Sequence, residues 1–323
     1  MFRVTSLTEM PEAQLNRWIK RIGLLLFVGI VAFVAFYAVD RFRAPAASIA
    51  DRQLTMLEEA VRQDPSDVAV RGQLADTYVA RERYDEAIAL YTQIIETGKE
   101  QRPAYIGRGR ALEFKGDLAG AAADYTKVVE MSTTGEMAAV DATLARAYFG
   151  LGAIALKQDK ADESIEYLTK ALAIKRTDAD TMNLLGAAYV KAGQPDEAIK
   201  HLEQAILFVP IGWAEPYQTL SDAYAAKGEA DKAEWAAAMA QAQTGDGIGA
   251  TARLEAIKDG KAGLDARVSL GLIAEQTGDT AAAATWYRSA LELESGNTAA
   301  AMGLARVTTG TQSHPSIAPS PSA

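Results

Sequence analysis

The sequence repeats itself over most of its length, with a period of 34 or 35 residues and two longer intervals. A leucine followed by a small residue recurs at Leu74, Leu151, Leu185, Leu220, Leu270 and Leu304. Arg108 takes the place of the leucine in one further copy, where Gly109 is the small residue. From Leu74 to Leu270 the successive copies lie 34, 43, 34, 35 and 50 residues apart. Such a period indicates a stack of small units, each of which buries its apolar face only against its neighbours.

Each copy carries the pattern of two helices. Leu185 and Tyr189 are four residues apart, which places both side chains on one face of a first helix. A second small position follows in every copy, and small residues let two helices approach closely. These second positions are Ala87, Ala121, Ser164, Ala198, Ala233 and Ala283. We therefore expect pairs of closely packed helices.

Glycine marks the turn between the two helices in most copies. A left-handed residue ends many helices, and glycine adopts that conformation without strain. The turn glycines are Gly116, Gly193, Gly228 and Gly278, whereas the first copy has Glu82-Arg83 there. Three second helices then open on the acidic pairs Asp85-Glu86, Asp162-Glu163 and Asp196-Glu197. We expect an N-cap carboxylate and a favourable charge at the helix dipole from each pair.

These positions resemble the tetratricopeptide repeat. The copy that matches best has Leu185, Gly186, Tyr189, Gly193, Ala198, Leu202, Ala205 and Pro210. The resemblance implies an all-α, right-handed solenoid over residues 49–307. Six full copies would begin near Val68, Arg102, Ala145, Ala179, Ala214 and Leu264. Ala50 to Pro65 fits a second helix alone and Thr298 to Val307 fits a first helix alone, so we expect both to cap the stack.

Two intervals are longer than the period. Around Met131 to Asp141 the extra residues predict that the first helix of the third copy extends back toward Glu136. Residues 245–263 contain five glycines around a short helical stretch from Thr251 to Lys258. We interpret this segment as a hinge or break in the solenoid, because glycine weakens helices.

A long apolar run precedes the repeats. From Ile22 to Val39 there are 18 residues without a charge, Asn, Gln, Ser or Thr. As a helix the run measures about 27 Å, close to the roughly 30 Å of a hydrocarbon core. The sequence thus predicts a transmembrane helix at 22–39, a short basic segment at 1–21 and a linker at 40–48.

Two questions about this run depend on its flanks. A signal peptide cleaved after Ala44-Pro45-Ala46 is the alternative, but Asp40, Arg41 and Arg43 separate that site from the apolar run. Lysines and arginines before the run slightly outnumber those after it. Since positive flanks stay in the cytoplasm, the repeats are expected on the extracytoplasmic side of a prokaryotic inner membrane. The two flanks differ by about one positive charge.

Composition argues against several classes of function. The chain has no cysteine and a net charge of −9, so disulfides and thiolate chemistry are excluded and nucleic-acid binding is disfavoured. His201 and His314 have no partner at metal-ligand spacing. Gly245 to Gly249 lacks the preceding strand of a phosphate-binding loop. We expect no enzyme, no cofactor, no metal and no small-molecule substrate.

The resemblance also implies a binding surface, because first helices of tetratricopeptide repeats line a groove. The groove positions here are Gln73, Asp76, Arg110, Glu113, Arg146, Phe149, Asn183, Gln218 and Asp222. An ordinary solvated helix face explains the same residues equally well. Members that bind chaperone tails carry Lys and Asn where this chain has Gly72, Asp76 and Gly107, so that activity is not expected. Trp213 is a second candidate contact, or it packs on the next helix.

We therefore expect an adaptor that holds partner proteins, membrane or envelope proteins among them, at a membrane surface, with a role in protein folding or complex assembly. One alternative is a stoichiometric structural subunit of a larger membrane complex. Another is a regulatory subunit whose partner chain carries the chemistry. The Ser, Thr and Pro of residues 308–323 indicate a disordered tail.

Overall fold

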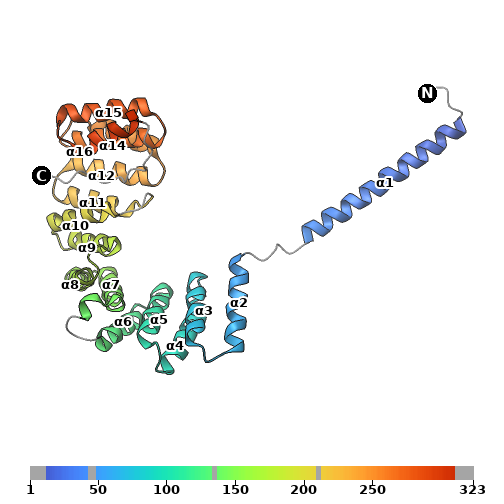
Figure 1. Cartoon of the computed structure of the whole chain (residues 1–323), viewed down its shortest axis with the longest axis horizontal. Helices are drawn as coiled ribbons and strands as arrows, with labels where there is room; N and C mark the ends of the chain where they lie inside the picture. The colour runs from blue at the N-terminus through green and yellow to red at the C-terminus, as the bar shows by residue number, and fades with distance from the viewer. Residues whose placement is uncertain (1–11, 43–48, 133–136, 209–211, 310–323) are drawn as a thin grey trace. The chain divides into compact units, whose positions relative to one another are not determined.

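The computed structural model describes residues 12–42, 49–132, 137–208 and 212–309 (Figure 1). Within these ranges the fold is all-α, as predicted. The helices are α1 Glu12–Phe42, α2 Ile49–Gln63, α3 Val68–Ala80, α4 Tyr84–Glu96, α5 Gln101–Lys115, α6 Leu118–Met131, the 3₁₀ helix η2 Ala138–Val140, α7 Ala142–Lys157, α8 Ala161–Ile174, α9 Ala179–Lys191, α10 Pro195–Leu207, α11 Glu215–Ala226, α12 Ala230–Gln243, α13 Gly247–Ile257, α14 Gly263–Gln276, α15 Thr280–Leu293 and α16 Thr298–Thr309.

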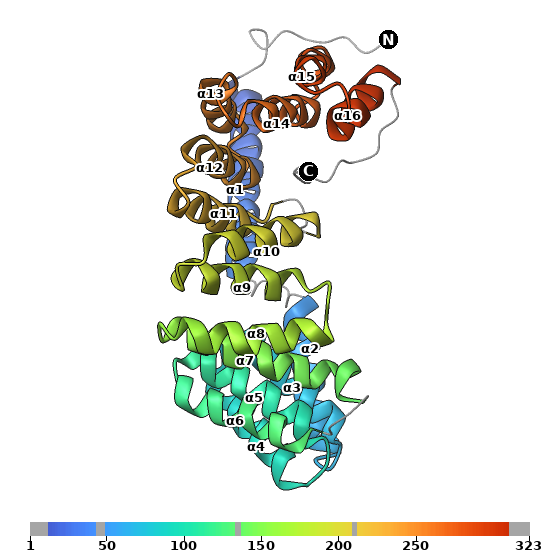
Figure 2. The same cartoon turned by 90° about the vertical axis from the view of Figure 1, so that its left-hand side faces the viewer.

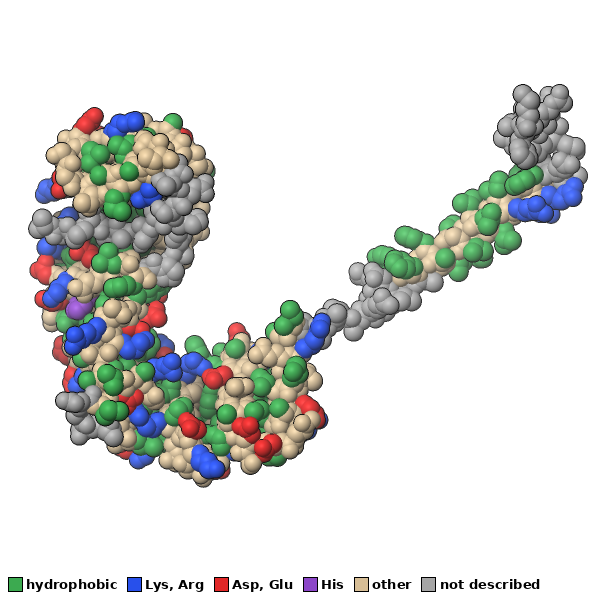
Figure 3. Space-filling view, in the orientation of Figure 1, with side chains coloured by type: hydrophobic (Ala, Val, Ile, Leu, Met, Phe, Trp, Pro, Cys, Tyr) green, Lys and Arg blue, Asp and Glu red, His purple; other side chains and the backbone are tan. Residues whose placement is uncertain are grey.

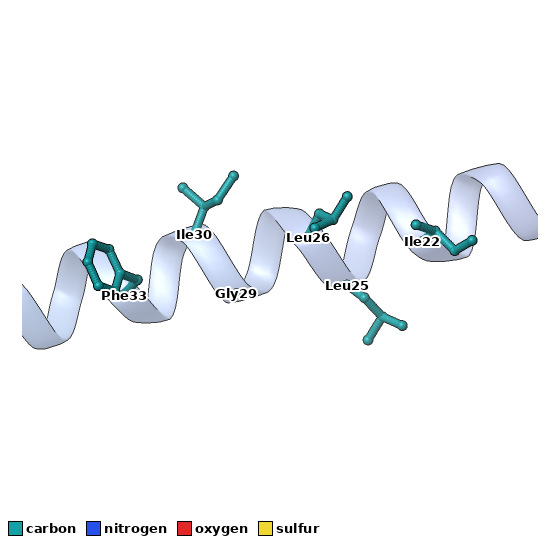
Figure 4. A pocket seen from close by; sticks show the side chains of 6 residues that line it. All are labelled: Ile22, Leu25, Leu26, Gly29, Ile30 and Phe33. Carbon is teal, nitrogen blue, oxygen red and sulfur yellow. The ribbon is translucent and has the colours of Figure 1, made fainter.

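The chain divides into two compact units, Met1–Glu59 and Ala60–Ala323. The first unit contains α1 and most of α2. Apolar side chains of α1 are exposed, Leu25 and Phe36 each by 71%. One face of α1 forms a shallow apolar hollow centred on Gly29, which Ile22, Leu25, Leu26, Ile30 and Phe33 line (Figure 4).

No helix among the residues that the structure describes is both long enough and apolar enough to cross a membrane. Within the predicted span at 22–39, Ala35, Ala38 and Val39 have side chains that lie outside the described part of the chain. The predicted tail is likewise outside it from residue 310 onward.

The second unit is a stack of helix pairs in which each helix packs on the next along the chain (Figures 1 and 2). Six copies are present: α3/α4, α5/α6, α7/α8, α9/α10, α11/α12 and α14/α15. Their first helices begin within three residues of the predicted positions, and α16 forms where a further first helix is predicted.

Glycines of the first helices receive bulky side chains of the second helices. Tyr125 lies against Gly109 of its own copy, where an added Cβ would stand 2.8 Å from the ring. The opposite edge of the same ring covers Gly150 of the next copy. Leu168 covers Gly152 in the same way, at 2.6 Å from an added Cβ. One side chain therefore joins two copies, and the small residues of the pattern are required because a methyl group would overlap it.

The backbone angles confirm the left-handed residues predicted for the turns inside the copies. Gly193 has φ of 70°, and the other three predicted glycines also have positive φ. Glu82 takes the same conformation in the first copy, with φ of 60°, and Asp159 does so in the third, with φ of 58°. Because these two side chains crowd the backbone there, each turn stores strain that glycine would avoid.

The prediction that the acidic pairs supply N-cap carboxylates is wrong. The caps of α4, α8 and α10 are Arg83, Lys160 and Gln194, which make no capping hydrogen bond, and the acidic pairs lie in the first turn. Their charges still face the positive end of the helix dipole. Carboxylates cap other helices, through Asp67, Asp117, Asp141, Asp178, Asp246 and Asp279.

The two insertions fold into short helices. Asp141 caps α7 by accepting hydrogen bonds from the Thr143 and Leu144 amides, both at 3.0 Å, so α7 begins at Ala142 and does not extend toward Glu136. The second insertion forms α13, which packs on α12 and α14 and buries Ala250 and Leu254 completely. The hinge at 245–263 stays a prediction.

Candidate functional site

A groove of about 410 Å³ crosses three successive first helices, α3, α5 and α7. Tyr91 and Ile94 of α4 form its buried floor, exposed by only 3% and 2%. The side chains that line it include Val68, Gln73, Asp76, Ile106, Arg110, Thr143 and Arg146. The structure thus brings together four of the nine predicted groove residues, Gln73, Asp76, Arg110 and Arg146.

Asp76 and Arg110 face each other across this groove. Arg110 donates a hydrogen bond of 2.8 Å to Asp76 Oδ1, and the Tyr91 hydroxyl donates one of 2.7 Å to the same oxygen. Burial and the neighbouring Asp76 carboxylate raise the pKa of Tyr91, so the hydroxyl remains a donor. Asp76 therefore already has two partners.

The same arrangement recurs at two further junctions between copies. Glu113 accepts hydrogen bonds from Tyr125 at 3.3 Å and from Lys157 of the next first helix at 2.6 Å. The third example joins Tyr287, Glu275 and Arg306. In each case a carboxylate binds a tyrosine of its own copy and a cation of the next copy. Glu113, which was predicted to contact a partner protein, thus connects neighbouring copies.

Arg146 and Gln73 keep their side-chain donors available in the groove. Both are exposed, and no ion pair joins Arg146 to another residue in the described ranges. A guanidinium offers five N–H donors and always carries its charge. The α7 end of the groove therefore presents a guanidinium that no described carboxylate neutralises.

The other four predicted residues lie away from this cavity. Phe149 is half-buried and packs on a cluster that contains Leu168 and Leu185. Asn183 is only 3% exposed, and its Oδ1 has no hydrogen-bond partner. Gln218 and Asp222 are exposed on α11 and do not line the groove. Residue numbers within a copy could not reveal these differences, because burial depends on how closely adjacent first helices pack.

Gly72 lines the groove although the sequence analysis named it only as a departure from the chaperone-tail binders. A Cβ added at Gly72 would meet no atom within 4 Å, because this position faces the open groove. Gly107 lies on the opposite wall, and a Cβ there would overlap the Tyr91 ring. One glycine therefore leaves space for a ligand and the other for a side chain of the protein itself.

The remaining sequence candidates are His201, His314 and Trp213. The half-buried His201 ring stacks on Tyr189 with centroids 5.6 Å apart. Burial, and then the charge of Lys200, lower the pKa of His201. The described residues hold no group of three or more metal-type ligands. His314 lies outside the described residues, and Trp213 is half-buried.

A second cavity of about 580 Å³ lies among α12, α13, α14 and α15. Ile248 of the inserted helix borders it and is 89% exposed, and Trp286 borders it from α15. No sequence pattern pointed to this cavity, since the insertion has no counterpart in the repeat pattern.

Comparisons with known proteins agree with this architecture. Three family models, each described as tetratricopeptide repeat, match residues 51–107, 143–206 and 249–306, which together are more than half of the chain. The chain belongs to the tetratricopeptide-repeat family. A search of curated proteins finds no match.

Several solved structures are similar to this chain. The Cut9–Hcn1 hetero-tetramer of APC/C aligns with a TM-score of 0.52 and 18% identity over 80% of this chain and 46% of that chain, so the match spans about half of the longer protein. BtubC from P. vanneervenii aligns with a TM-score of 0.51 and 20% identity over 60% of this chain and 87% of that one. YrrB, described as a tetratricopeptide-repeat protein with an unusual peptide-binding site, has a TM-score of 0.46 and 19% identity over 64% and 97%.

Proposed function

We propose that this protein is a scaffold that binds an extended segment of a partner protein in the groove across α3, α5 and α7. The observation that carries the proposal is the groove itself. It combines an apolar floor, open space above Gly72 and the unused donors of Gln73 and Arg146. Apolar clefts with a few polar groups are typical binding sites, and the polar groups fix the orientation of the ligand.

A peptide-display screen against the full chain tests this proposal. Gly72→Leu places a bulky side chain in the groove. Because glycine is unfavourable inside a helix, this substitution should not lower the stability of the fold. We expect wild type to enrich a family of related peptides and Gly72→Leu to enrich none of them. Gly296→Leu is the matched control, because its Cβ would also meet open space but far along the chain in the turn before α16. Identical enrichment by wild type and Gly72→Leu would show that the groove is not the binding site.

The scaffold is further proposed to work at a membrane, in folding or assembly of membrane or envelope proteins. The support is the uncharged run at 22–39 together with the exposure of the apolar side chains of α1. A tether raises the effective concentration of partners on the same membrane, so weak contacts in the groove suffice. Carbonate extraction of membranes tests the tether: the full chain should stay in the pellet, whereas a chain that begins at Ala50 should not.

The orientation is a separate proposal, with the solenoid on the extracytoplasmic side of an inner membrane. It depends on the small excess of Lys and Arg before the run. Added protease should digest residues 50–323 in spheroplasts with an intact membrane. Digestion that begins only after lysis would place the solenoid on the cytoplasmic side.

A further inference from the structure

We infer that the segment bound in the groove carries an acidic side chain about four residues from an apolar one. This inference deepens the proposed groove binding and rests on it. It concerns an internal stretch of a partner protein, with the acidic group at Arg146 and the apolar group above Gly72.

The charges of the groove point to the acidic group. Four charged residues border the cavity: Asp76, Glu100, Arg110 and Arg146. Asp76 and Arg110 neutralise each other at 2.8 Å. Glu100 and Arg146 make no ion pair among the described residues; Glu100 precedes α5, whereas Arg146 lies on α7, where Thr143 offers a further hydroxyl donor. A carboxylate is the ligand group that matches a planar guanidinium with two parallel hydrogen bonds.

The walls of the groove point to the apolar group. Val68 and Ile106 are half-buried and line the groove together with Gly72 and the buried Ile94. The missing Cβ of Gly72 leaves this part of the groove open. An apolar side chain of the ligand would remove these groups from water, which is favourable in proportion to the area covered.

The distance between the two subsites sets the spacing in the ligand. The apolar part lies between α3 and α5, and Arg146 lies on α7, the next first helix. Packed helices lie about 8–10 Å apart, so the middle of the space between α3 and α5 lies about one and a half spacings, or about 12–15 Å, from α7. An extended chain advances about 3.3 Å per residue and alternates its side chains between two faces, so two anchoring side chains on one face lie about four residues apart. Because three successive helices line the groove, a chain crosses it rather than ending in it.

Labelled ten-residue peptides with a central Leu-x-x-x-Glu test the inference against the full chain in detergent. Peptides with Leu-x-x-x-Gln and Leu-x-x-x-Lys are the comparison, each with a free and an amidated C-terminus. We expect the Glu peptide to bind about tenfold or more tightly than the Gln peptide, with the amide making no difference. A preference for the free C-terminus without a preference for Glu would overturn the internal acidic segment.

Arg146→Gln should remove the preference for Glu, whereas Arg288→Gln, an exposed arginine of α15, should leave it unchanged. Arg146→Glu should reverse the preference toward the Lys peptide. Affinity for the Glu peptide should also fall as salt is raised, because Arg146 is exposed.

The two proposals fail in different ways. If Gly72→Leu abolishes binding of all peptides but Arg146→Gln binds Glu and Gln peptides with the wild-type ratio, the groove is the binding site and the acidic inference is wrong. If neither substitution changes binding, the groove itself is not the site.

Discussion

The Tyr287 hydroxyl donates a hydrogen bond of 2.8 Å to Glu275 Oε2, and the same carboxylate pairs with Arg306 of the following helix at 2.9 Å. The tyrosine ring is 1% exposed and lies between Gly271 and Gly303. A single side chain thus fills the junction between α14, α15 and α16 and fixes the charge pair at its edge. The Tyr91 and Tyr125 junctions repeat this design near the start of the solenoid.

Removing the hydroxyl alone should weaken this junction. Tyr287→Phe keeps the ring but leaves the partly buried Glu275 with one donor fewer, so we expect a loss of about 1–2 kcal/mol in unfolding free energy. Urea unfolding of the full chain in detergent measures it. The loss caused by Tyr287→Phe should be smaller in a chain that already carries Arg306→Gln and Glu275→Gln. An equal loss in the wild-type chain and in this doubly substituted chain would show that the hydroxyl does not act through this carboxylate.

The same carboxylate predicts a loss of stability in acid. Burial tends to raise the pKa of Glu275, but the hydrogen bonds from Arg306 and Tyr287 outweigh it and hold the pKa below its usual value. A carboxyl group whose pKa is lower in the folded state stabilises the protein above its unfolded pKa, near 4.5, and that contribution disappears as the pH falls through the folded value. Glu275→Gln should be less stable than wild type at pH 7 and should lose less stability on acidification; parallel pH profiles would contradict this assignment.

A methyl group at Gly303 should separate α15 from α16. Its Cβ would overlap the Tyr287 ring, so we expect Gly303→Ala to cost about 1–3 kcal/mol. Gly296→Ala is the control, because a Cβ there meets no atom within 4 Å. The midpoints of thermal unfolding of the two variants should differ by several degrees. Equal midpoints would mean that the contact between the Tyr287 ring and Gly303 does not stabilise the position of α16.

The strained turn of the first copy can be relieved. Glu82 has φ of 60° where other copies have glycine, so Glu82→Gly should raise the unfolding free energy by about 1 kcal/mol. Gly193 has φ of 70°, and Gly193→Ala should lower the unfolding free energy by about 1–2 kcal/mol. Destabilisation by Glu82→Gly in urea unfolding would show that the Glu82 side chain makes a contribution larger than the strain.

Asp265 should have the opposite pH dependence to Glu275. Burial, and then the nearby Glu203 and Glu294, raise the pKa of Asp265, although Lys232 opposes the shift. The folded state therefore binds the proton more tightly, and stability falls as the pH rises from about 3.8 through the folded pKa. Asp265→Asn should be more stable than wild type at pH 7, with an advantage that vanishes near pH 4. An advantage that does not change with pH would point to packing rather than charge.

The sequence predicts the repeats well because they are local and periodic. The position of Gly193 is enough to predict a left-handed turn, and Leu185 and Gly186 are enough to place a first helix. The N-caps were assigned wrongly because an Asp one or two residues into a helix resembles an Asp at its cap in a single sequence. Asp141 is one of six aspartates that do cap helices, and its capping bonds explain why α7 starts where it does.

The groove was predictable only in part. Repeat positions identified Gln73, Asp76, Arg110 and Arg146, but not whether each side chain faces the groove or another copy. Glu113 accepts hydrogen bonds from Tyr125 and Lys157, and Asn183 is buried. These outcomes depend on the spacing of neighbouring helices, which residue types alone do not fix. Gly72 and Gly107 have the same residue type and opposite surroundings.

Site-specific photocrosslinking in native membranes tests the central claim most directly. A crosslinking amino acid at Gln73, an exposed groove position, should join the full chain to a discrete set of partner proteins, and Gly72→Leu in the same chain should abolish the products. The same amino acid at Lys127, exposed on α6 and outside the groove, should give none of them. Products from Gln73 that persist with Gly72→Leu, or that appear equally from Lys127, would contradict a scaffold that binds its partners in this groove.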